Sequence, residues 1–298
     1  MIGCEESSSH GARRLFAPRV NRVTLSSEAM NDGQSRSASK PSVSAIIVCY
    51  NEEDNIGRCL NSLRWCDEIV VVDSFSTDRT VEICRQFTNL VIQREWAGYR
   101  DQKVFAQSKT TKDWVLMIDS DEEVTPDLQK EILEQLGAAD SSCAGFLIAR
   151  LVFYLDRWWR RGGWYPDYGI RLFRRDCARW AGNEPHAKII VNGPARCLRN
   201  PLHHFSYRDI DDHIQRINRF TSISSKELRS QGGRWRLTDA LLRPAFKFLK
   251  SYLLKRGFME GFAGFHVAAT AAMYVYLKYA KLWELEIKEK KEVGRKRL

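Results

Sequence analysis

The sequence feature that most constrains the fold is a short apolar run that ends in acids, Trp114-Val115-Leu116-Met117-Ile118-Asp119-Ser120-Asp121-Glu122-Glu123. A run of this length is typical of a strand buried in a parallel sheet. Open α/β sheets bind ligands beyond the carboxyl ends of their strands, so Asp119 and Asp121 are predicted to border a crevice. Two carboxylates spaced i, i+2 can share one hard divalent cation. The alternative is an acidic helix cap, since Pro126 stands at a typical first helical position.

Bulk composition narrows the class of protein. The 298 residues suffice for one large or two small domains. A net charge of +10 favours a polyanionic partner, such as nucleic acid, an anionic membrane or a phosphorylated substrate. Residues 1–41 are rich in Ser, Arg and Gly and contain no secretory signal, which predicts a disordered tail. The eight scattered cysteines include no Cys-x-x-Cys pair, which is typical of reduced thiols in a cytoplasmic protein.

Short strands and helices alternate through the first half of the folded chain. This alternation predicts βαβ units and a parallel sheet. No G-x-G-x-x-G follows a strand, and no Gly-Lys-Ser/Thr phosphate loop is present. Phosphates would therefore be held by a metal and by basic side chains. The predicted strands are residues 43–50, 68–73, 90–92 and 114–118, and the predicted helices open at Asn51, near Val81 and over about 99–108.

Three motifs at predicted strand ends resemble glycosyltransferase family 2, and most closely its lipopolysaccharide core glucosyltransferase branch. They are residues 44–53, residues 69–74 with 76–80, and residues 114–116 with 119–122. The resemblance covers about residues 43–285. It implies an α/β GT-A fold, with a mixed sheet flanked by helices and a C-terminal helical extension. It also implies a nucleotide-sugar donor, Mg²⁺ or Mn²⁺, and inversion at the anomeric carbon.

The resemblance also implies a domain plan. A GT-A domain is expected at 42–230, with a nucleotide half at 42–137 and an acceptor half at 138–230. A basic helical extension follows at 231–298.

The same resemblance assigns a nucleoside pocket. Tyr50 would pack on the donor base, and Asp73 would accept a hydrogen bond from the uracil imide. Asn51, Glu52 and Asp78 would shape the rest of the pocket. From the residues alone, Tyr50 is equally an ordinary core side chain, and Asp73 and Asp78 are helix caps. Phe75 departs from the commonest family pattern, which has Gly at that place.

The diphosphate and metal positions also come from the resemblance. Asp121 would be the main metal ligand, and Asp119 would contact the ribose or a metal-bound water. Lys103 would meet the phosphates, although a solvated lysine fits the residues alone. In the segment 201–207, His203 and His204 resemble a His-aromatic-Ser/Thr element of the family, and His204 is the candidate third metal ligand. A structural histidine pair is the alternative.

An aromatic and basic cluster opens the acceptor half. Trp faces stack on sugar rings, and Arg binds phosphate or carboxylate in a bidentate manner, so the cluster fits an anionic glycan or glycolipid acceptor. The alternative is a Trp-rich core with a basic edge. Single-stranded nucleic acid is disfavoured, because the acidic strand ends would repel it. The cluster is Phe153, Tyr154, Trp158, Trp159, Arg160, Arg161, Trp164 and Tyr165.

Inversion requires a base that takes the proton of the acceptor hydroxyl. Glu184 is the first candidate and Asp167 the second, in segments that resemble the same branch. Relatives often carry an acid directly after the histidine at position 186, where this chain has Ala187. If that acid is the base in those relatives, Glu184 replaces it or the chain is impaired.

The C-terminal region is basic and partly amphipathic. Residues 240–256 predict a helix with an apolar face and a basic face, which suits an anionic membrane surface. Residues 261–277 are almost uncharged but, at 17 residues, lie at the lower limit for a span. The prediction is a protein peripheral on the inner face of the cytoplasmic membrane. The alternative is a helical pair that packs against the enzyme domain.

The sequence therefore predicts an inverting transferase that moves a sugar from a UDP-sugar, with UDP-glucose suggested by the resemblance, to a lipopolysaccharide-core or other envelope glycan. Transfer to a polyprenyl phosphate is a second hypothesis. A non-catalytic, membrane-associated scaffold of the same fold is a third, supported by Ala187 alone. Oligomeric state is left open.

Overall fold

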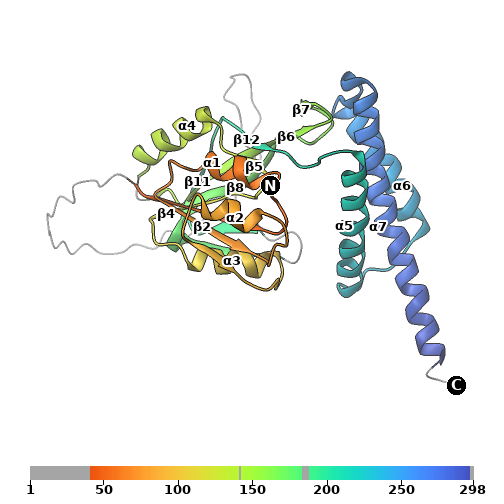
Figure 1. Ribbon diagram of the computed structural model, residues 1–298. Coiled ribbons are helices and arrows are strands. Elements are labelled where there is room, and N and C mark those ends of the chain that lie inside the picture. The colour runs from red at the N-terminus through yellow and green to blue at the C-terminus, as the bar shows by residue number, and fades with distance from the viewer. Residues whose placement is uncertain (1–40, 141, 183–187, 296–298) are drawn as a thin grey trace, which may run out of the picture. The chain divides into compact units, whose positions relative to one another are not determined.

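The computed structural model describes residues 41–140, 142–182 and 188–295. This part contains a ten-stranded mixed sheet, a separate two-stranded sheet and a set of C-terminal helices (Figure 1). The strands of the large sheet follow the order β3-β2-β1-β4-β8-β6-β12-β5, and β7 and β11 also pair with β6.

The first half of the chain builds the parallel side of this sheet. Strand β1 pairs with β2 and β4, and β2 pairs with β3, all in parallel. Cys49 lies opposite Asp73, so the carboxyl ends of β1 and β2 meet at one edge, as predicted. The elements are β1 (Val43–Cys49), α1 (Ile56–Asn61), β2 (Glu68–Asp73), α2 (Thr80–Arg85), β3 (Val91–Gln93), α3 (Tyr99–Ser108), β4 (Trp114–Met117), β5 (Glu122–Glu123) and α4 (Pro126–Gly137).

The second half makes the sheet mixed. Strand β8 runs antiparallel to both β4 and β6, and β6 is the long strand on which β7, β11 and β12 also pair. Strand–helix alternation predicted a parallel sheet, and the strands up to β4 are indeed parallel, whereas β8 is antiparallel to its neighbours. The elements are β6 (Gly145–Tyr154), β7 (Arg157–Trp159), β8 (Asp167–Arg174), η1 (Arg175–Cys177), β9 (Ala178–Ala181), β10 (Lys188–Val191), β11 (Ala195–Cys197) and β12 (Leu202–His204). Strands β9 and β10 form the two-stranded sheet.

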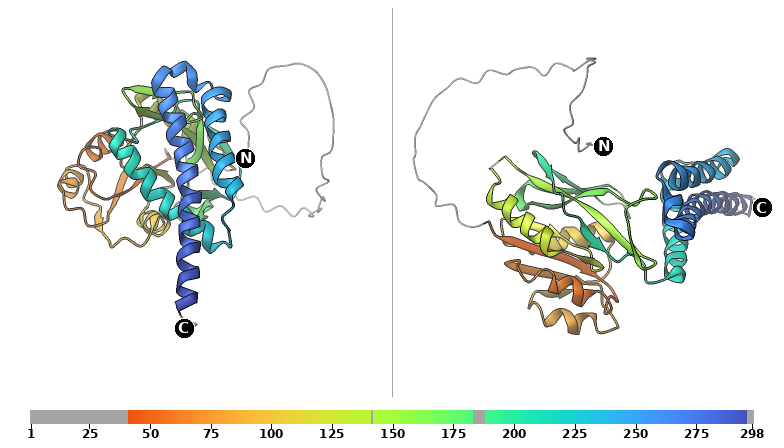
Figure 2. Two further views of the ribbon diagram at one scale, coloured as in Figure 1. Left: turned by 90° about the vertical axis from the view of Figure 1, so that its right-hand side faces the viewer. Right: turned by 90° about the horizontal axis from the view of Figure 1, so that it is seen from above.

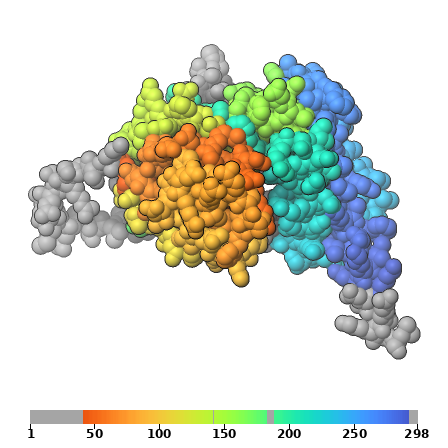
Figure 3. All heavy atoms as spheres, in the orientation of Figure 1, coloured from red at the N-terminus to blue at the C-terminus, as the bar shows by residue number. Residues whose placement is uncertain are grey.

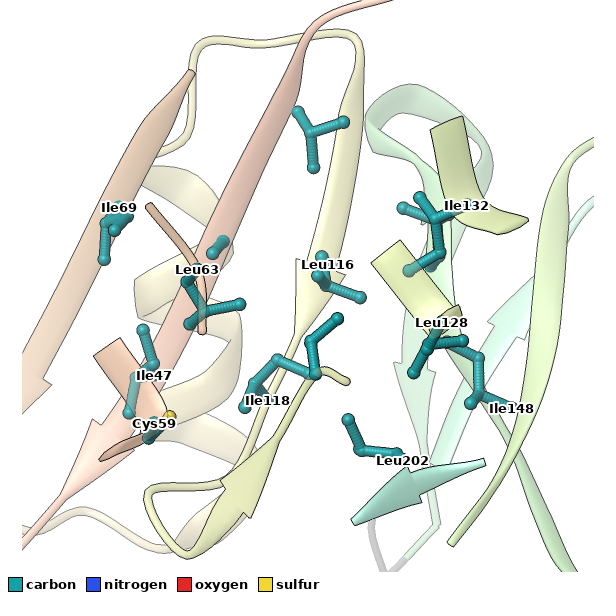
Figure 4. Close-up of a cluster of buried hydrophobic side chains, with 14 of the residues drawn as sticks. Ile47, Cys59, Leu63, Ile69, Leu116, Ile118, Leu128, Ile132, Ile148 and Leu202 are labelled. Carbon is teal, nitrogen blue, oxygen red and sulfur yellow. The ribbon is translucent and has the colours of Figure 1, made fainter. Parts of the chain in front are cut away.

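One large apolar cluster lies between the sheet and helices α1 and α4 (Figure 4). Leu128 and Ile132 of α4 meet Ile148 and Leu202 of the sheet there, and each is fully buried. Thr125 caps α4 by accepting a hydrogen bond from the Leu128 backbone, and Pro126 takes the first helical position. The acidic run is therefore followed by the helix start that Pro126 predicted.

Helix α1 starts five residues later than predicted, at Ile56 instead of Asn51. Asn51 adopts a φ of 52°, in the left-handed region, and cannot begin a helix. Its side chain instead accepts a hydrogen bond from the Thr77 backbone at 2.8 Å. The Glu53 carboxylate likewise accepts from the Arg79 backbone at 3.1 Å, so these two side chains bind a neighbouring loop instead of the helix N-terminus.

The cysteines follow the prediction with one exception. Cys49, Cys59, Cys84 and Cys143 are buried free thiols, and Cys66 and Cys177 are half-buried and free. Cys197, by contrast, is disulfide-bonded, so the expectation of reduced thiols throughout was wrong there.

Helices make up the C-terminal region, and Figure 2 shows them from two further sides. Helix α7 packs against both α5 and α6, and Tyr279, Leu282 and Ala240 form a small core between them. The elements are α5 (Ile210–Ser230), α6 (Leu237–Leu249), the π turn η2 (Lys250–Leu254), the 3-10 turn η3 (Gly257–Glu260) and α7 (Gly261–Arg295).

The turn between α6 and α7 contacts the second half of the sheet, as Figure 3 shows where the green β7 segment meets the blue helices. Glu260 of η3 pairs with Arg161 at 2.8 Å and with Arg157 at 3.8 Å. The predicted helix over 240–256 ends at Leu249, because η2 and a left-handed Arg256 (φ 56°) turn the chain into η3. None of the helices within the described residues is both long enough and apolar enough to cross a bilayer.

Candidate active site

A two-residue ladder places a histidine beside the acidic run. Strand β5 pairs antiparallel with β12, with His204 opposite Glu122 and His203 opposite Glu123. The Phe205 backbone then donates a hydrogen bond to the carbonyl of Asp121 at 2.9 Å. Residues more than eighty positions apart in sequence therefore meet at the carboxyl end of β4.

The Asp121 carboxylate and the His204 imidazole form the centre of this site. Asp121 Oδ2 lies 3.4 Å from His204 Nε2, and the two side chains are only 11% and 15% exposed. The Ser206 hydroxyl lies 2.9 Å from His204 Nδ1 and fixes the ring. Burial alone would lower the pKa of His204, but the Asp121 and Glu122 carboxylates outweigh it and raise that pKa.

The carboxylate oxygen suits either Mg²⁺ or Mn²⁺ when substrate phosphates supply the remaining ligands, and the imidazole nitrogen favours the softer Mn²⁺ of the two. Asp121 and His204 thus fit a divalent cation as a pair. Asp119, the third predicted ligand, does not join them. Within the described residues, no three His, Cys, Asp or Glu side chains gather closely enough to hold one ion.

Asp119 is instead held by two cations. Its carboxylate accepts hydrogen bonds from Lys103 at 2.8 Å and from Arg171 at 3.3 Å. Although burial alone would raise the pKa of Asp119, Lys103 and Arg171 hold it well below its ordinary value. Lys103, predicted to contact phosphate, therefore contacts Asp119, and its side chain is 17% exposed.

Sequence reasoning missed the arginines of this site. Arg171 is buried and also donates to Glu122 at 2.9 Å, and Glu122 is fully buried. Burial raises the pKa of Glu122, while Arg171 opposes that shift. The signal was available, because Arg171 stands among the alternating apolar residues of β8, where an inward-facing charge requires a buried partner.

A second arginine reaches the site from the C-terminal helices. Arg216 of α5 lies 4.0 Å from Asp121 Oδ2 and 3.2 Å from Asp212. Burial alone would lower the pKa of Arg216, but Asp212, and after it Asp121 and Glu52, raise that pKa. Nothing in the sequence placed Arg216 near the acidic run, since its position depends on the path of the chain after β12.

The predicted nucleoside residues lie on two loops that are joined by hydrogen bonds. The loop after β1 donates from the backbone of Glu52 to Thr80 and from that of Glu53 to Asp78, at 2.8 and 3.2 Å. Burial raises the pKa of Glu52, and the Asp121 charge adds to the shift, so Glu52 lies near the metal pair. The two loops thus form one wall beside Asp121.

Asp73 is fully buried at the end of β2 and serves the loop that follows it. Its carboxylate accepts from the Ser76 backbone at 2.9 Å, from the Ser76 hydroxyl and from Gln93 at 3.2 Å. A base would reach Asp73 only by displacing one of these donors. The helix-cap interpretation of Asp78 agrees with the hydrogen bond that it accepts from the Thr80 backbone at 3.0 Å.

Tyr50 and Phe75 are exposed aromatic side chains on these two loops, at 55% and 50%. Tyr50 is therefore not an ordinary core residue. Phe75 adopts a φ of 61°, a left-handed conformation that glycine adopts without steric strain.

Comparisons with known proteins identify the family of the chain. The sequence profile of Glycosyl transferase family 2 matches residues 44–198. A glycosyltransferase of Rickettsia typhi is 32% identical over 85% of this chain and 90% of its own. The lipopolysaccharide core biosynthesis glycosyltransferase LpsC of Rhizobium meliloti is 30% identical over 81% of this chain and 92% of its own.

The chain belongs to glycosyltransferase family 2. Its mixed sheet flanked by helices is the GT-A fold that the motifs predicted. Among solved structures, the mannosyltransferase PcManGT of Pyrobaculum calidifontis, in complex with GDP-mannose and Mn²⁺, is similar with a TM-score of 0.48 and 15% identity, over 83% of this chain and 88% of that one.

Only one of the two candidate bases of this glycosyltransferase can be placed. Glu184, with Ala187, lies outside the described residues. Asp167 opens β8, and its side chain is 53% exposed. Its carboxylate is bound by Arg150, whose Nε donates at 2.9 Å and whose second nitrogen also donates. Asp167 would have to leave Arg150 to take a proton.

The aromatic cluster of the glycosyltransferase divides into two parts. Tyr154 and Trp159 are buried core residues that pack with Val267 of α7, as the core interpretation predicted. The Tyr154 hydroxyl lies 3.1 Å from His213 of α5 and 3.2 Å from His266 of α7. These rings join the sheet to the C-terminal helices.

Phe153 and Trp158 of the cluster lie instead with His203 and Phe205, in a half-buried group that we call the aromatic shelf. The Trp158 and His203 rings are 3.9 Å apart, and Phe153 and Phe205 both contact Trp158. The Arg58 guanidinium lies 3.6 Å from the centre of the Phe205 ring. His203 and Phe205 flank His204 in sequence, and the Phe205 backbone donates to the Asp121 carbonyl, so the shelf is joined to the metal pair through the backbone.

Proposed function

We propose that this family 2 enzyme is a metal-dependent, inverting hexosyltransferase. It takes a sugar from a UDP-sugar, with UDP-glucose as the first donor to test, and adds it to a lipopolysaccharide-core or other cell-envelope glycan. The observation that carries the proposal is the pairing of Asp121 with His204, 3.4 Å apart, at the carboxyl end of β4. The relationship to LpsC supports the class of acceptor.

Asp121 and His204 would hold the Mg²⁺ or Mn²⁺ ion. When bound there, the ion neutralises charge on the diphosphate leaving group. Arg216 stands 4.0 Å from Asp121 and adds a fixed positive charge on the same side. Asp119, held by Lys103 and Arg171, is better suited to accept a hydrogen bond from the ribose than to bind the metal directly.

The paired loops after β1 and β2 would hold the nucleoside. Tyr50 is exposed and available to stack on the base. Asn51, Glu52 and Asp78 hold the two loops together, so their part is to fix the pocket wall. Asp73 would contact the uracil imide by exchanging its bond with Ser76 or Gln93.

Glu184 is the proposed base, with Asp167 in reserve. The base must accept the hydroxyl proton as the acceptor oxygen attacks the anomeric carbon. Arg150 occupies the Asp167 carboxylate, which favours Glu184. A Glu184→Gln variant that keeps donor binding but loses transfer would support this assignment. Full transfer in that variant would move the assignment to Asp167.

The aromatic shelf is the proposed acceptor subsite. Trp158 presents a half-buried ring against His203, the neighbour of His204 in sequence, and such a ring suits stacking on a sugar. Arg160 is exposed next to it and can bind a phosphate or carboxylate on the glycan. We expect Trp158→Ala to raise the acceptor KM about tenfold while leaving donor hydrolysis unchanged. An unchanged KM would remove the shelf from the acceptor site.

We also place the enzyme on the cytoplasmic membrane, peripheral on its inner face, because its acceptor is membrane-bound. The exposed apolar side chains of α6 favour this, and they equally favour a second candidate function, transfer to a polyprenyl phosphate. Parallel assays with core oligosaccharide and with a lipid phosphate separate the two. No nucleic acid partner is proposed.

A donor screen tests the proposed function. Bound ligand raises the thermal unfolding temperature, so the chain is scanned with UDP-glucose, other UDP-sugars and GDP-mannose, each with and without Mn²⁺. We expect a Mn²⁺-dependent shift with a UDP-sugar that is lost in His204→Ala. Asp176→Ala is the matched control, because this acid is exposed and pairs with the neighbouring Arg175 instead of a residue of the site. If UDP-sugars raise the unfolding temperature equally with and without Mn²⁺, and equally in His204→Ala, the metal assignment is contradicted.

A further inference from the structure

Large apolar side chains cover one continuous stretch of the C-terminal region, from the start of α6 to the start of α7. Phe262 is 82% exposed and Leu254 71%, well beyond what isolated surface residues show. Apolar surface of this extent on a soluble chain marks an interaction site. We call this set the apolar face: Leu237, Leu241, Leu242, Phe246, Leu249, Leu253, Leu254, Phe258, Met259, Phe262 and Phe265.

The apolar face is supported by a fixed backbone. A side chain at Gly264 would lie 1.8 Å from the Gly257 carbonyl, so α7 and η3 approach as closely as glycine allows. The Ser251 hydroxyl of η2 donates to the Gly162 carbonyl at 2.6 Å, and Glu260 pairs with Arg161. The turn is thus held in place, and its apolar side chains point outward from an ordered surface.

Positive charge accompanies the apolar face. Residues 237–281 contain seven Lys or Arg and two acids. Both acids have partners, since Asp239 pairs with Arg243 at 2.7 Å and Glu260 pairs with Arg161. Lys247, Lys250 and Lys255 are exposed between the apolar side chains. A basic, apolar surface of this kind complements anionic lipid headgroups over an acyl layer.

A groove of about 400 Å³ between α6 and α7 adds a specific feature. Leu242, Phe246 and Val275 line it with Arg243, Lys278 and Tyr279. Both cations lie over the same ring, Arg243 at 5.7 Å and Lys278 at 4.8 Å from the centre of Tyr279. Burial, and then the Arg243 charge, lower the pKa of Lys278. Two like charges beside an apolar groove favour an anion that carries a hydrocarbon chain.

We propose that the apolar face inserts into the interfacial layer of an anionic bilayer, with a lipid phosphate seated between Arg243 and Lys278 in the groove. The inference deepens the proposed function, which requires a membrane-bound acceptor, but the docking itself does not depend on sugar transfer. A second copy of the chain is a poorer occupant, because a symmetric contact would bring the same cations together.

The position of this surface suits the proposed acceptor. Turn η3 is held to Arg157 of β7 and to Arg161, which follows that strand, and β7 also carries Trp158 of the aromatic shelf. A bilayer against the apolar face would therefore lie beside the strand that presents the shelf. A lipid-anchored glycan could reach the metal pair without leaving the membrane.

Vesicle flotation of the full chain tests the proposal. One set of vesicles is phosphatidylcholine, and a second has part of it replaced by phosphatidylglycerol. We expect flotation with the anionic vesicles, and at least a tenfold weaker vesicle affinity in Phe258→Ser with Phe262→Ser, on the order expected for two lost apolar anchors. Arg243→Gln with Lys278→Gln should weaken binding to the anionic vesicles only.

Two measurements keep this test separate from the proposed function. The matched control is Leu90→Ser with Val104→Ser, which removes two apolar side chains, each 42% exposed, outside the C-terminal helices. Thermal unfolding confirms that each variant folds.

The proposal fails if wild-type protein binds neither vesicle type, or if the control variant loses as much vesicle binding as the Phe variants. It also fails if light scattering shows a dimer that the Phe variants abolish. Vesicle binding without any Mn²⁺-dependent donor shift would leave the docking intact and remove the proposed activity.

Discussion

Helices α4 and α6 have the same kind of sequence and opposite surroundings. Both carry an apolar stripe at helical spacing. Leu128, Ile132 and Leu136 of α4 are buried against the sheet, whereas Leu242 and Phe246 of α6 are more than 60% exposed. An amphipathic pattern therefore establishes that a helix has an apolar face, and only the fold shows whether protein covers that face. In the sheet region, the apolar stripe of α4 is covered by protein, whereas in the C-terminal region the apolar stripe of α6 is exposed.

The largest expected effect separates the two regions by activity. Asp121→Ala removes the carboxylate of the metal pair, and we expect transfer to fall by about 10²–10³-fold, the cost of losing one major electrostatic contact. Vesicle binding should be unchanged, because the apolar face is far along the chain from Asp121. Initial rates with a UDP-sugar and flotation measure both. A variant that keeps full transfer would refute the metal site, and Asp176→Ala serves again as the exposed-acid control.

The second prediction compares the two apolar stripes directly. Leu128→Ala should lower the free energy of unfolding by about 2–5 kcal/mol, because it leaves a cavity in the main core. Leu242→Ala should change it by less than about 0.5 kcal/mol, because that side chain is 66% exposed. Urea unfolding in the absence of lipid gives both values. If both variants lost the same free energy of unfolding, protein would have to cover α6 in solution, and the contrast between α4 and α6 would be wrong.

The third prediction concerns the joint between the regions, where His213 is buried beside Tyr154. Burial, with the His266 charge, lowers the pKa of His213 to about 4. The unfolded chain therefore binds this proton more tightly, and stability should rise as pH increases from about 4 to 6.5, by at most about 3 kcal/mol. Urea unfolding across this range should show a smaller slope in His213→Phe. A wild-type stability that falls over the same range would contradict the prediction.

Features of the fold and site that depend on nearby residues in the sequence could be predicted, whereas features that depend on contacts between distant segments could not. Strands β1, β2 and β4 and helix α3 were located within a residue or two, since their apolar periods are local. The acidic edge of the sheet followed from the rule that strand ends carry the site. Family membership was predicted from the motifs and is confirmed by the sequence comparisons.

Features set by distant contacts were missed. Arg216 reaches the acidic run from α5, and no local pattern reveals such a meeting. Lys103 and Asp119 were assigned to different ligands, although they bind each other at 2.8 Å. The burial of Tyr154 and Trp159, in contrast to the half-exposed Trp158, depends on where α7 packs. Composition alone could not divide the aromatic cluster into core and shelf.

The path of the chain after β12 has a practical consequence for protein engineering. His204 lies six residues beyond the segment matched by the family profile, and Arg216 lies further still, within α5. A shortened protein cut at position 198 would lack half of its proposed metal pair, together with β12 and the core residue Leu202. The smallest fragment worth expressing as a transferase therefore extends through α5. Because α7 packs on that helix, C-terminal deletions should be assayed for donor binding as well as for solubility.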